Sequence, residues 1–205
     1  MQYDIKQGIK GLIFDLDGTL ADTMPYHYRA WLIACKRFGI SIDQEFLQKH
    51  TGRPAIIIAD IILKENNLYG KVSTKEMTKE KTKAFFEQLQ YVTPIEPVFD
   101  IVKKYYGKLP MAVGTGGHRE AVERTLKITD LRQYFDIIIT ANDVVNFKPH
   151  PETFLKCAEK MNVEPRFIEV FEDGELGIDA AKTAGMQATD VRSWYESIWK
   201  DRHIT

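Results

Sequence analysis

Two aspartates, Asp15 and Asp17, lie at the end of a short apolar run, residues 11–16, that predicts a buried strand. Side chains alternate along an extended segment, so both carboxylates project to the same side and can act on one substrate. Gly18 then permits a tight turn, and Thr19 offers a hydroxyl and an amide to an anion. This pattern suits phosphate or metal chemistry. The alternative is an ordinary Asp-Gly turn held by hydrogen bonds to the aspartate side chain.

A glycine-rich segment with one hydroxyl side chain is the second candidate. Thr115 lies among Gly114, Gly116 and Gly117, after another apolar run and before a helix expected to begin near His118. Free amides at a helix N-terminus, together with a hydroxyl, can bind an anion. A glycine-rich turn without a ligand is the alternative.

A lysine and an acidic pair complete the set of four clusters. Lys148 precedes Pro149, which fixes the local backbone and can hold the ammonium over a compact anion; a solvated surface lysine is the alternative. Glu172 and Asp173 end a further apolar run. Adjacent carboxylates suit Mg²⁺, which takes oxygen ligands, whereas the alternative is helix capping by Asp173 with Glu172 exposed.

An alternation of strands and helices is expected to position these clusters. Beyond about residue 93, short apolar runs alternate with helical periodicity, which predicts an α/β fold with a mostly parallel sheet. Ligands of such sheets bind outside the carboxyl ends of the strands, and each cluster directly follows a predicted strand. The predicted strands are residues 11–16, 111–113, 136–140, 167–171 and 188–191, and helices are expected to begin near residues 117, 151 and 174.

Residues 22–92 have helical periodicity and no obvious strand. Ile57, Ile58, Ile61 and Ile62, for example, share one helical face. We therefore predict an α/β core of residues 1–21 and 93–205, interrupted by a helical insert of residues 22–92. Proline-flanked segments at residues 23–25 and 93–97 are the expected hinges.

The order of the four clusters resembles the haloacid dehalogenase superfamily of phosphotransferases. The resemblance covers nearly the whole chain and implies a Rossmann-like parallel sheet with a helical cap inserted after the first strand. Residues 26–31 and 171–178 are similar to the subgroup that contains β-phosphoglucomutase and small sugar-phosphate phosphatases. The motifs that carry the resemblance are Asp15-Leu16-Asp17-Gly18-Thr19-Leu20, Thr115, Lys148-Pro149 and Glu172-Asp173.

The resemblance implies covalent phosphoryl transfer assisted by Mg²⁺. Asp15 would attack phosphorus to form an aspartyl-phosphate, and Asp17 would protonate the leaving group and then deprotonate water. Asp17 must therefore hold a proton while Asp15 is ionised. The implied metal ligands are the Asp15 carboxylate, the Asp17 backbone carbonyl and Asp173, with Glu172 as a ligand or as the holder of a bound water. The implied phosphoryl-binding groups are Thr115, Lys148 and the amides of Gly116 and Gly18.

The insert, as a cap, is expected to select small phosphorylated metabolites. His27 matches a residue of the subgroup, and the Gly52-Arg53-Pro54 loop is similar to that of phosphatases acting on substrates such as fructose 1-phosphate. The mutases of the subgroup have an arginine where this chain has Ala55. We therefore predict a sugar-phosphate phosphatase in which His27 and Arg53 contact the substrate, with β-phosphoglucomutase as the alternative. A non-catalytic binding protein, the third hypothesis, would not need a nucleophile and a proton shuttle together.

Composition restricts the partners of the protein. The 205 residues have a formal net charge of -1, so no overall field attracts nucleic acid or an anionic membrane, and a small molecule is the expected partner. We see no signal peptide and no apolar run long enough to span a bilayer. Cys35 and Cys157 are expected to be reduced core thiols of a soluble cytoplasmic protein. The sequence gives no prediction of oligomeric state.

Overall fold

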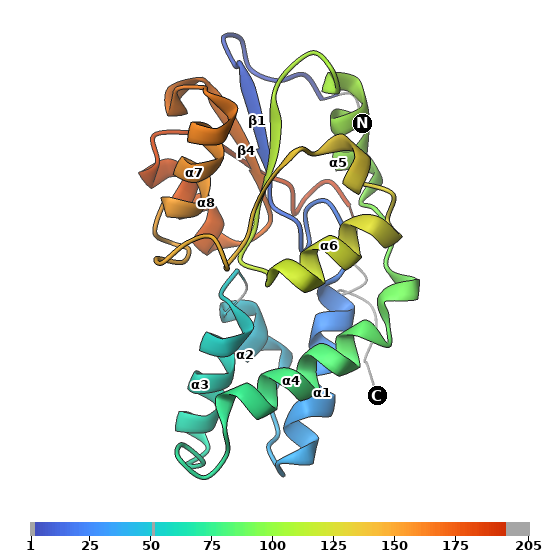
Figure 1. The fold of residues 1–205 in the computed structure, drawn as a ribbon, viewed down its shortest axis with the longest axis vertical. Helices are drawn as coiled ribbons and strands as arrows, with labels where there is room; N and C mark the ends of the chain where they lie inside the picture. Colours follow the sequence, from blue (N-terminus) through green and yellow to red (C-terminus); the bar gives the residue numbers. More distant parts are fainter. Residues whose placement is uncertain (1–2, 51, 196–205) are drawn as a thin grey trace.

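Five parallel strands form a central sheet in the computed structural model, which describes residues 3–50 and 52–195 (Figure 1). The strand order β3-β2-β1-β4-β5 places β1 between β2 and β4, and every neighbouring pair is parallel. The predicted parallel α/β sheet is therefore confirmed, with strand ends that differ from the predicted ones by one or two residues. The strands are β1 (Gly11–Phe14), β2 (Met111–Gly114), β3 (Ile137–Ile139), β4 (Ile168–Glu172) and β5 (Gln187–Asp190).

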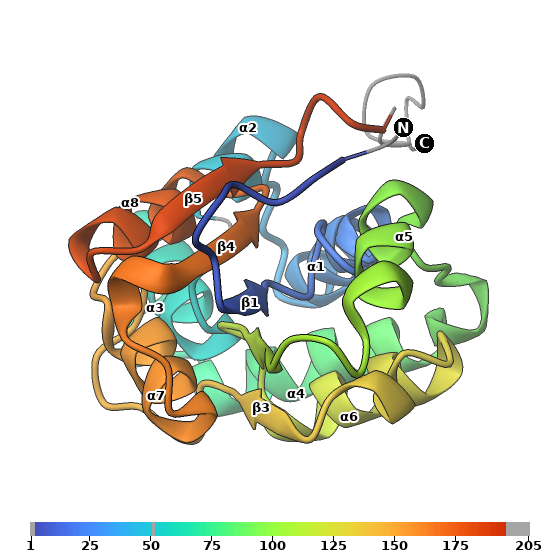
Figure 2. The same ribbon diagram turned by 90° about the horizontal axis from the view of Figure 1, so that it is seen from above.

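Helices cover both faces of the sheet (Figure 2). Val98 and Leu126, from α5 and α6, belong to the buried cluster on one face, and Phe154 and Ala180, from α7 and α8, belong to the cluster on the other. Sequence reasoning missed α5, because Pro97 lies within it. A proline is compatible with the first turn of a helix, where its missing N–H has no partner within the helix. These helices are α5 (Glu96–Tyr105), α6 (Arg119–Ile128), α7 (Glu152–Met161) and α8 (Glu175–Thr183).

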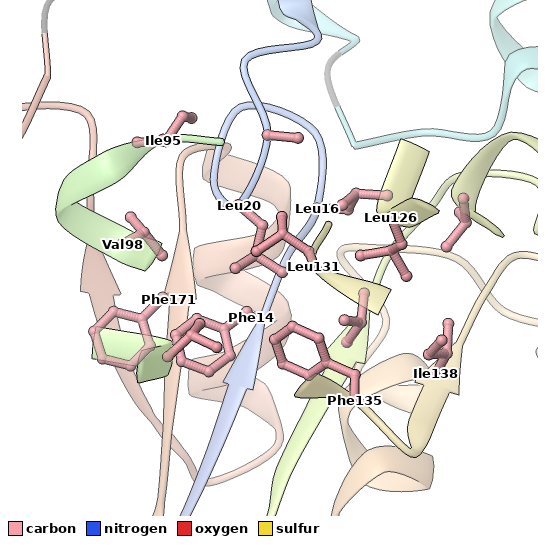
Figure 3. Close-up of a cluster of buried hydrophobic side chains, with 14 of the residues drawn as sticks. Phe14, Leu16, Leu20, Ile95, Val98, Leu126, Leu131, Phe135, Ile138 and Phe171 are labelled. Carbon is pink, nitrogen blue, oxygen red and sulfur yellow. The ribbon is translucent and has the colours of Figure 1, made fainter. Parts of the chain in front are cut away.

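Aromatic rings from β1 and β4 pack together on the face of the sheet covered by α5 and α6 (Figure 3). Phe14 and Phe171 face each other across β1 and β4, and their rings stack with centroids 4.9 Å apart. The edge of Phe135 packs near Phe14, with ring centroids 5.8 Å apart. Phe14 and Phe171 are fully buried, and the residue that follows each of them is acidic, Asp15 after Phe14 and Glu172 after Phe171. Packing of these rings therefore sets two acidic side chains beside each other.

The first four of the α-helices between β1 and β2 lie together beyond the carboxyl ends of the strands (Figure 1). They have an apolar cluster of their own that includes Trp31, Ile62 and Met77. The two segments that connect them to the sheet run side by side, because the Asp22 N–H donates to the Thr93 carbonyl at 2.9 Å. The helices are α1 (Met24–Arg37), α2 (Gln44–Lys49), α3 (Ala55–Glu65) and α4 (Thr74–Phe86), and 3-10 turns occur at Leu89–Tyr91, Arg132–Tyr134 and Pro165–Phe167.

Both cysteines are buried free thiols, as predicted. Cys35 packs in the apolar cluster of the helical insert, and Cys157 belongs with Phe154 to the cluster between the sheet and helices α7 and α8. Among the residues that the structure describes, no helix has both the length and the apolar character needed to cross a membrane.

Candidate active site

Three acidic residues and one lysine meet at the carboxyl ends of β1 and β4. The Asp15 N–H donates to the Phe171 carbonyl at 3.0 Å, which keeps Asp15 beside the end of β4. The Lys148 Nζ lies 2.7 Å from an Asp15 oxygen and 2.6 Å from a Glu172 oxygen. Lys148 is only 2 % exposed, so the alternative of a solvated surface lysine is wrong.

Asp15, Glu172 and Asp173 can offer one oxygen each to a cation. The three oxygens all lie within 4.8 Å of one another. Lys148 supplies one positive charge against three carboxylates, so the fully ionised cluster has an excess of negative charge that a divalent ion would neutralise. Burial and the neighbouring carboxylates Glu172 and Asp15 raise the pKa of Asp173 well above its usual value. The donor set therefore fits a hard divalent cation such as Mg²⁺.

Two glycines make room for these carboxylates. Gly18 has a φ of +86°, and a Cβ there would lie 2.3 Å from an Asp173 oxygen. A Cβ on Gly177 of α8 would lie 1.7 Å from a Glu172 oxygen. The Gly18 N–H donates to the Ala21 carbonyl at 2.9 Å, so in this arrangement it is not a free phosphoryl donor. The predicted donation from the Gly18 amide to a phosphoryl group stays a prediction, whereas the lack of a side chain at Gly18 leaves room for Asp173.

Asp17 faces the helical insert rather than the acidic cluster. One Asp17 oxygen accepts hydrogen bonds from the Thr23 hydroxyl, at 2.8 Å, and from His27 Nε2, at 3.0 Å. The Lys81 Nζ lies 2.7 Å from His27 Nδ1. An ammonium can only donate, so Nδ1 accepts and the proton of the neutral ring lies on Nε2, which donates to Asp17. The predicted metal contact of Asp17 involves its backbone carbonyl and stays a prediction.

Lys81 is a candidate site residue that sequence reasoning missed. It is 7 % exposed, and burial lowers its pKa to about 8. A signal was present in the sequence, because Lys81 lies four residues after Met77 and four before Phe85, on the apolar face of α4. A lysine on a buried helical face requires a polar partner, which here is His27.

We expected Asp17 to hold a proton while Asp15 is ionised, but in the structure without a ligand Asp15 has the higher pKa. Burial raises the pKa of Asp15 to about 8, although Lys148 favours its ionised form. Burial also opposes ionisation of Asp17, but its interaction with His27, the hydrogen bond from Thr23 and the charge of Lys81 outweigh burial and hold the pKa of Asp17 below its usual value. Burial and the charge of Lys81 in turn lower the pKa of His27. The arrangement of charges without a ligand thus favours a proton on Asp15.

Thr115, Gly116 and Gly117 line the same cavity as the aspartates. Thr115 is held by its N–H, which donates to the Ile139 carbonyl at 3.0 Å. Its hydroxyl oxygen accepts from the Gly117 N–H at 2.9 Å, which leaves the hydroxyl proton to donate elsewhere. A Cβ on Gly116 would lie 2.3 Å from the Gly52 carbonyl oxygen, so the loop before α3 closes directly over this segment.

The cavity under that loop encloses about 120 Å³. His27 and Arg53 line it from the insert, and Ala55 lines it as well; contact of His27 and Arg53 with a substrate stays a prediction. The Arg53 Nε is buried and has no hydrogen-bond partner among the described residues. An unpaired buried N–H is costly, so it favours a ligand that brings an acceptor oxygen. Of the predicted site residues, Lys148 and Gly18 do not line the cavity.

Comparisons with known proteins agree with this geometry. The profile of a family described as haloacid dehalogenase-like hydrolases matches residues 12–191. A fructose-1-phosphate phosphatase of Escherichia coli (strain K12) is 42% identical, over 89% of this chain and 96% of the relative. A phosphorylated carbohydrates phosphatase of Thermotoga maritima is 32% identical, over 87% of this chain and 83% of the relative. The crystal structure of β-phosphoglucomutase from Clostridium difficile superposes with a TM-score of 0.79 at 31% identity, covering 89% of this chain and 84% of that one.

Proposed function

The chain belongs to the haloacid dehalogenase-like hydrolases, and from this premise we propose that it is a Mg²⁺-dependent phosphatase of small sugar phosphates. The observation that carries the proposal is the convergence of Asp15, Glu172, Asp173 and Lys148 on one side of a cavity that also contains Asp17. The relative named fructose-1-phosphate phosphatase supports a substrate of that kind.

Asp15 is the proposed nucleophile. One of its oxygens attacks phosphorus, the bond from phosphorus to the sugar oxygen breaks, and an aspartyl-phosphate forms. Lys148, already 2.7 Å from Asp15, offsets the charge that gathers on the phosphoryl oxygens. The Thr115 hydroxyl and the Gly116 amide are the proposed donors to those oxygens.

Asp17 is the proposed acid and base. It gives a proton to the leaving sugar oxygen and later takes one from the water that hydrolyses the aspartyl-phosphate. A phosphoryl dianion next to Asp17 raises its pKa, which opposes the effect of His27 and favours uptake of the proton. His27 then holds the Asp17 carboxylate in place through its Nε2–H.

Asp15, Glu172, Asp173 and the Asp17 carbonyl are the proposed Mg²⁺ ligands. When bound, the ion would supply positive charge that keeps Asp15 ionised and lets the phosphate dianion approach it. Lys148 and the Gly174 N–H, at 2.7 Å, already hold one oxygen each of Glu172 and so fix the orientation of its carboxylate.

Residues 22–92 are the proposed cap that selects the sugar. Arg53, with its unpaired Nε, is the proposed partner of a sugar or phosphoryl oxygen. Ala55 brings no charge to the cavity, which disfavours a substrate with a second phosphate at that place. We therefore favour the phosphatase over the alternative, a β-phosphoglucomutase, whose support is the structural similarity to the Clostridium difficile protein.

Release of inorganic phosphate from a panel of hexose and pentose phosphates tests the proposal. We expect turnover with Mg²⁺, highest on ketose 1-phosphates, and none after chelation with EDTA. Conversion of β-glucose 1-phosphate to glucose 6-phosphate with a bisphosphate primer, without phosphate release, would instead establish the mutase. Inactivity in both assays with an intact fold would favour a binding protein.

A further inference from the structure

A second and larger hollow adjoins the catalytic cavity. It is a groove of about 930 Å³ between the insert and the sheet domain. One wall is α4, and the opposite wall consists of the start of α6 and the loop after β3, with His118, Asn142 and Phe147. Nothing in the proposed catalytic steps uses this groove.

Three lysines of α4 line the groove. Lys75, Lys79 and Lys83 are spaced four residues apart, so they form one stripe along the helix, and all three are exposed. None of them makes an ion pair with a residue in the described part of the chain. Thr78 and Thr82 add hydroxyls to the same wall.

The acidic residues nearby do not cancel this charge. Glu80 of α4 turns away and pairs with Arg37 of α1 at 2.8 Å. Of the two acids that line the groove, Glu120 is paired with Arg124 at 2.8 Å and Glu87 is exposed. Because the whole chain has a net charge of only -1, the positive character of this wall is local.

The groove is continuous with the catalytic cavity. His118 stands at the boundary, directly after the Thr115 segment, and its Nε2 lies 3.1 Å from the Asn142 side-chain nitrogen. The Arg119 N–H donates to the Asn142 oxygen, so the Asn142 nitrogen is the donor to His118. The residues that line both hollows are Ala55, Thr82, His118 and Ala121.

We propose that this groove is an outer anion site through which phosphorylated substrates reach Asp15, and that Lys75, Lys79 and Lys83 attract them there. The proposal rests on the proposed phosphatase function. A cleft lined by charges of one sign concentrates ligands of the opposite sign and speeds their association. The catalytic cavity is small, and the four carboxylates in its wall outnumber the cations Arg53 and Lys81, so it offers little attraction to a dianion at long range. These carboxylates are Asp15, Asp17, Glu172 and Asp173. The lysine stripe supplies that attraction at the entrance.

Matched triple variants test the proposal. The groove variant carries Lys75→Gln, Lys79→Gln and Lys83→Gln. The surface variant carries Lys36→Gln, Lys127→Gln and Lys160→Gln, which removes the same charge from exposed lysines that line neither hollow. Circular dichroism and thermal melting check that both fold.

The substrates are para-nitrophenyl phosphate, which has no sugar, and fructose 1-phosphate. At low ionic strength we expect kcat/KM of the groove variant to fall about tenfold, and the deficit to close as salt shortens the screening length. The surface variant should keep the wild-type values. Equal kcat/KM in the two variants across all salt concentrations would overturn the proposal.

Calorimetric titration with inorganic phosphate separates this proposal from the proposed function. We expect the groove variant to bind phosphate several-fold more weakly than the surface variant at low salt. If the wild-type protein hydrolyses no ester, the phosphatase assignment fails and the titration alone decides the groove: weaker binding in the groove variant supports it, and equal binding overturns it.

Discussion

Gly177→Ala is a one-methyl change that the structure predicts to be damaging, although helix propensity favours it. Gly177 lies inside α8, where alanine is preferred over glycine by about 1 kcal/mol. A Cβ at this position, however, would lie 1.7 Å from Glu172 Oε1 and 2.1 Å from its Cδ. The Glu172 carboxylate would have to leave its place, because its rotamer is fixed by two hydrogen bonds.

The loss of stability can be estimated from the contacts of the Glu172 carboxylate. Overpacking costs about 1 to 3 kcal/mol. Loss of a hydrogen bond to a charged group adds about 1.5 to 3 kcal/mol, here the bond to the fully buried Lys148. After subtracting the gain in helix propensity, we expect the free energy of unfolding to fall by about 3 kcal/mol. Urea unfolding measures this change. The control is Lys182→Ala, at an exposed position on the same helix, and its free energy of unfolding should stay within about 0.5 kcal/mol of wild type.

A double-mutant cycle with Glu172→Ala isolates the cause. In that background the clash is absent, so adding Gly177→Ala should be neutral or stabilising by up to about 1 kcal/mol. The same displacement should weaken Mg²⁺ binding, measured by calorimetry. If Gly177→Ala alone is as stable as wild type, or more stable, the described packing of Glu172 against α8 is wrong.

Three further changes probe other parts of the site. Thr115→Ala should lower kcat on sugar phosphates about a hundredfold, because one donor to the phosphoryl group is lost, and should lower the melting temperature slightly, because the Gly117 N–H loses its acceptor; an unchanged kcat would contradict this. Arg53→Met should raise KM about tenfold, because the substrate loses a hydrogen bond from a charged group. A KM equal to that of wild type in steady-state kinetics would contradict this role of Arg53. Burial lowers the pKa of Lys81 to about 8 from 10.5, so between these values the unfolded chain binds more protons and the stability of the folded state rises with pH. Between pH 7.5 and pH 10, the free energy of unfolding of wild type, measured in urea, should rise by up to about 3 kcal/mol relative to that of Lys81→Met. A difference between the two proteins that does not change with pH would exclude the lowered pKa of Lys81.

The sheet and the acidic residues at its edge could be predicted because both follow from local pattern. Buried parallel strands read as short apolar runs, and residues that end such runs meet at one edge of the sheet. In the structure Phe14 of β1 pairs with Phe171 of β4, so the residues that follow them, Asp15 and Glu172, lie beside each other. The α5 helix was missed because proline at a helix start and proline in a hinge look alike in sequence.

The details of the site depend on contacts between distant segments, which no local pattern encodes. A single lysine before a proline gives no sign that Lys148 is buried. Its burial depends on two carboxylates, Asp15 and Glu172, which lie more than 20 positions away in the sequence, one on each side. Lys81 acts through His27, 54 positions earlier in the chain. Gly18 was expected to donate its amide, but the turn directs that N–H to Ala21. The pKa order of the two aspartates likewise depends on which cation faces each of them.

The most direct test of the account is to find the phosphoryl group on the enzyme. Wild-type protein turning over a sugar phosphate with Mg²⁺ is quenched in acid within milliseconds, digested and analysed by mass spectrometry. We predict a phosphoryl group on Asp15, absent from Asp15→Asn, which should neither become labelled nor release phosphate. Steady hydrolysis with no phosphoryl group on Asp15, or with the group on another residue, would contradict the account.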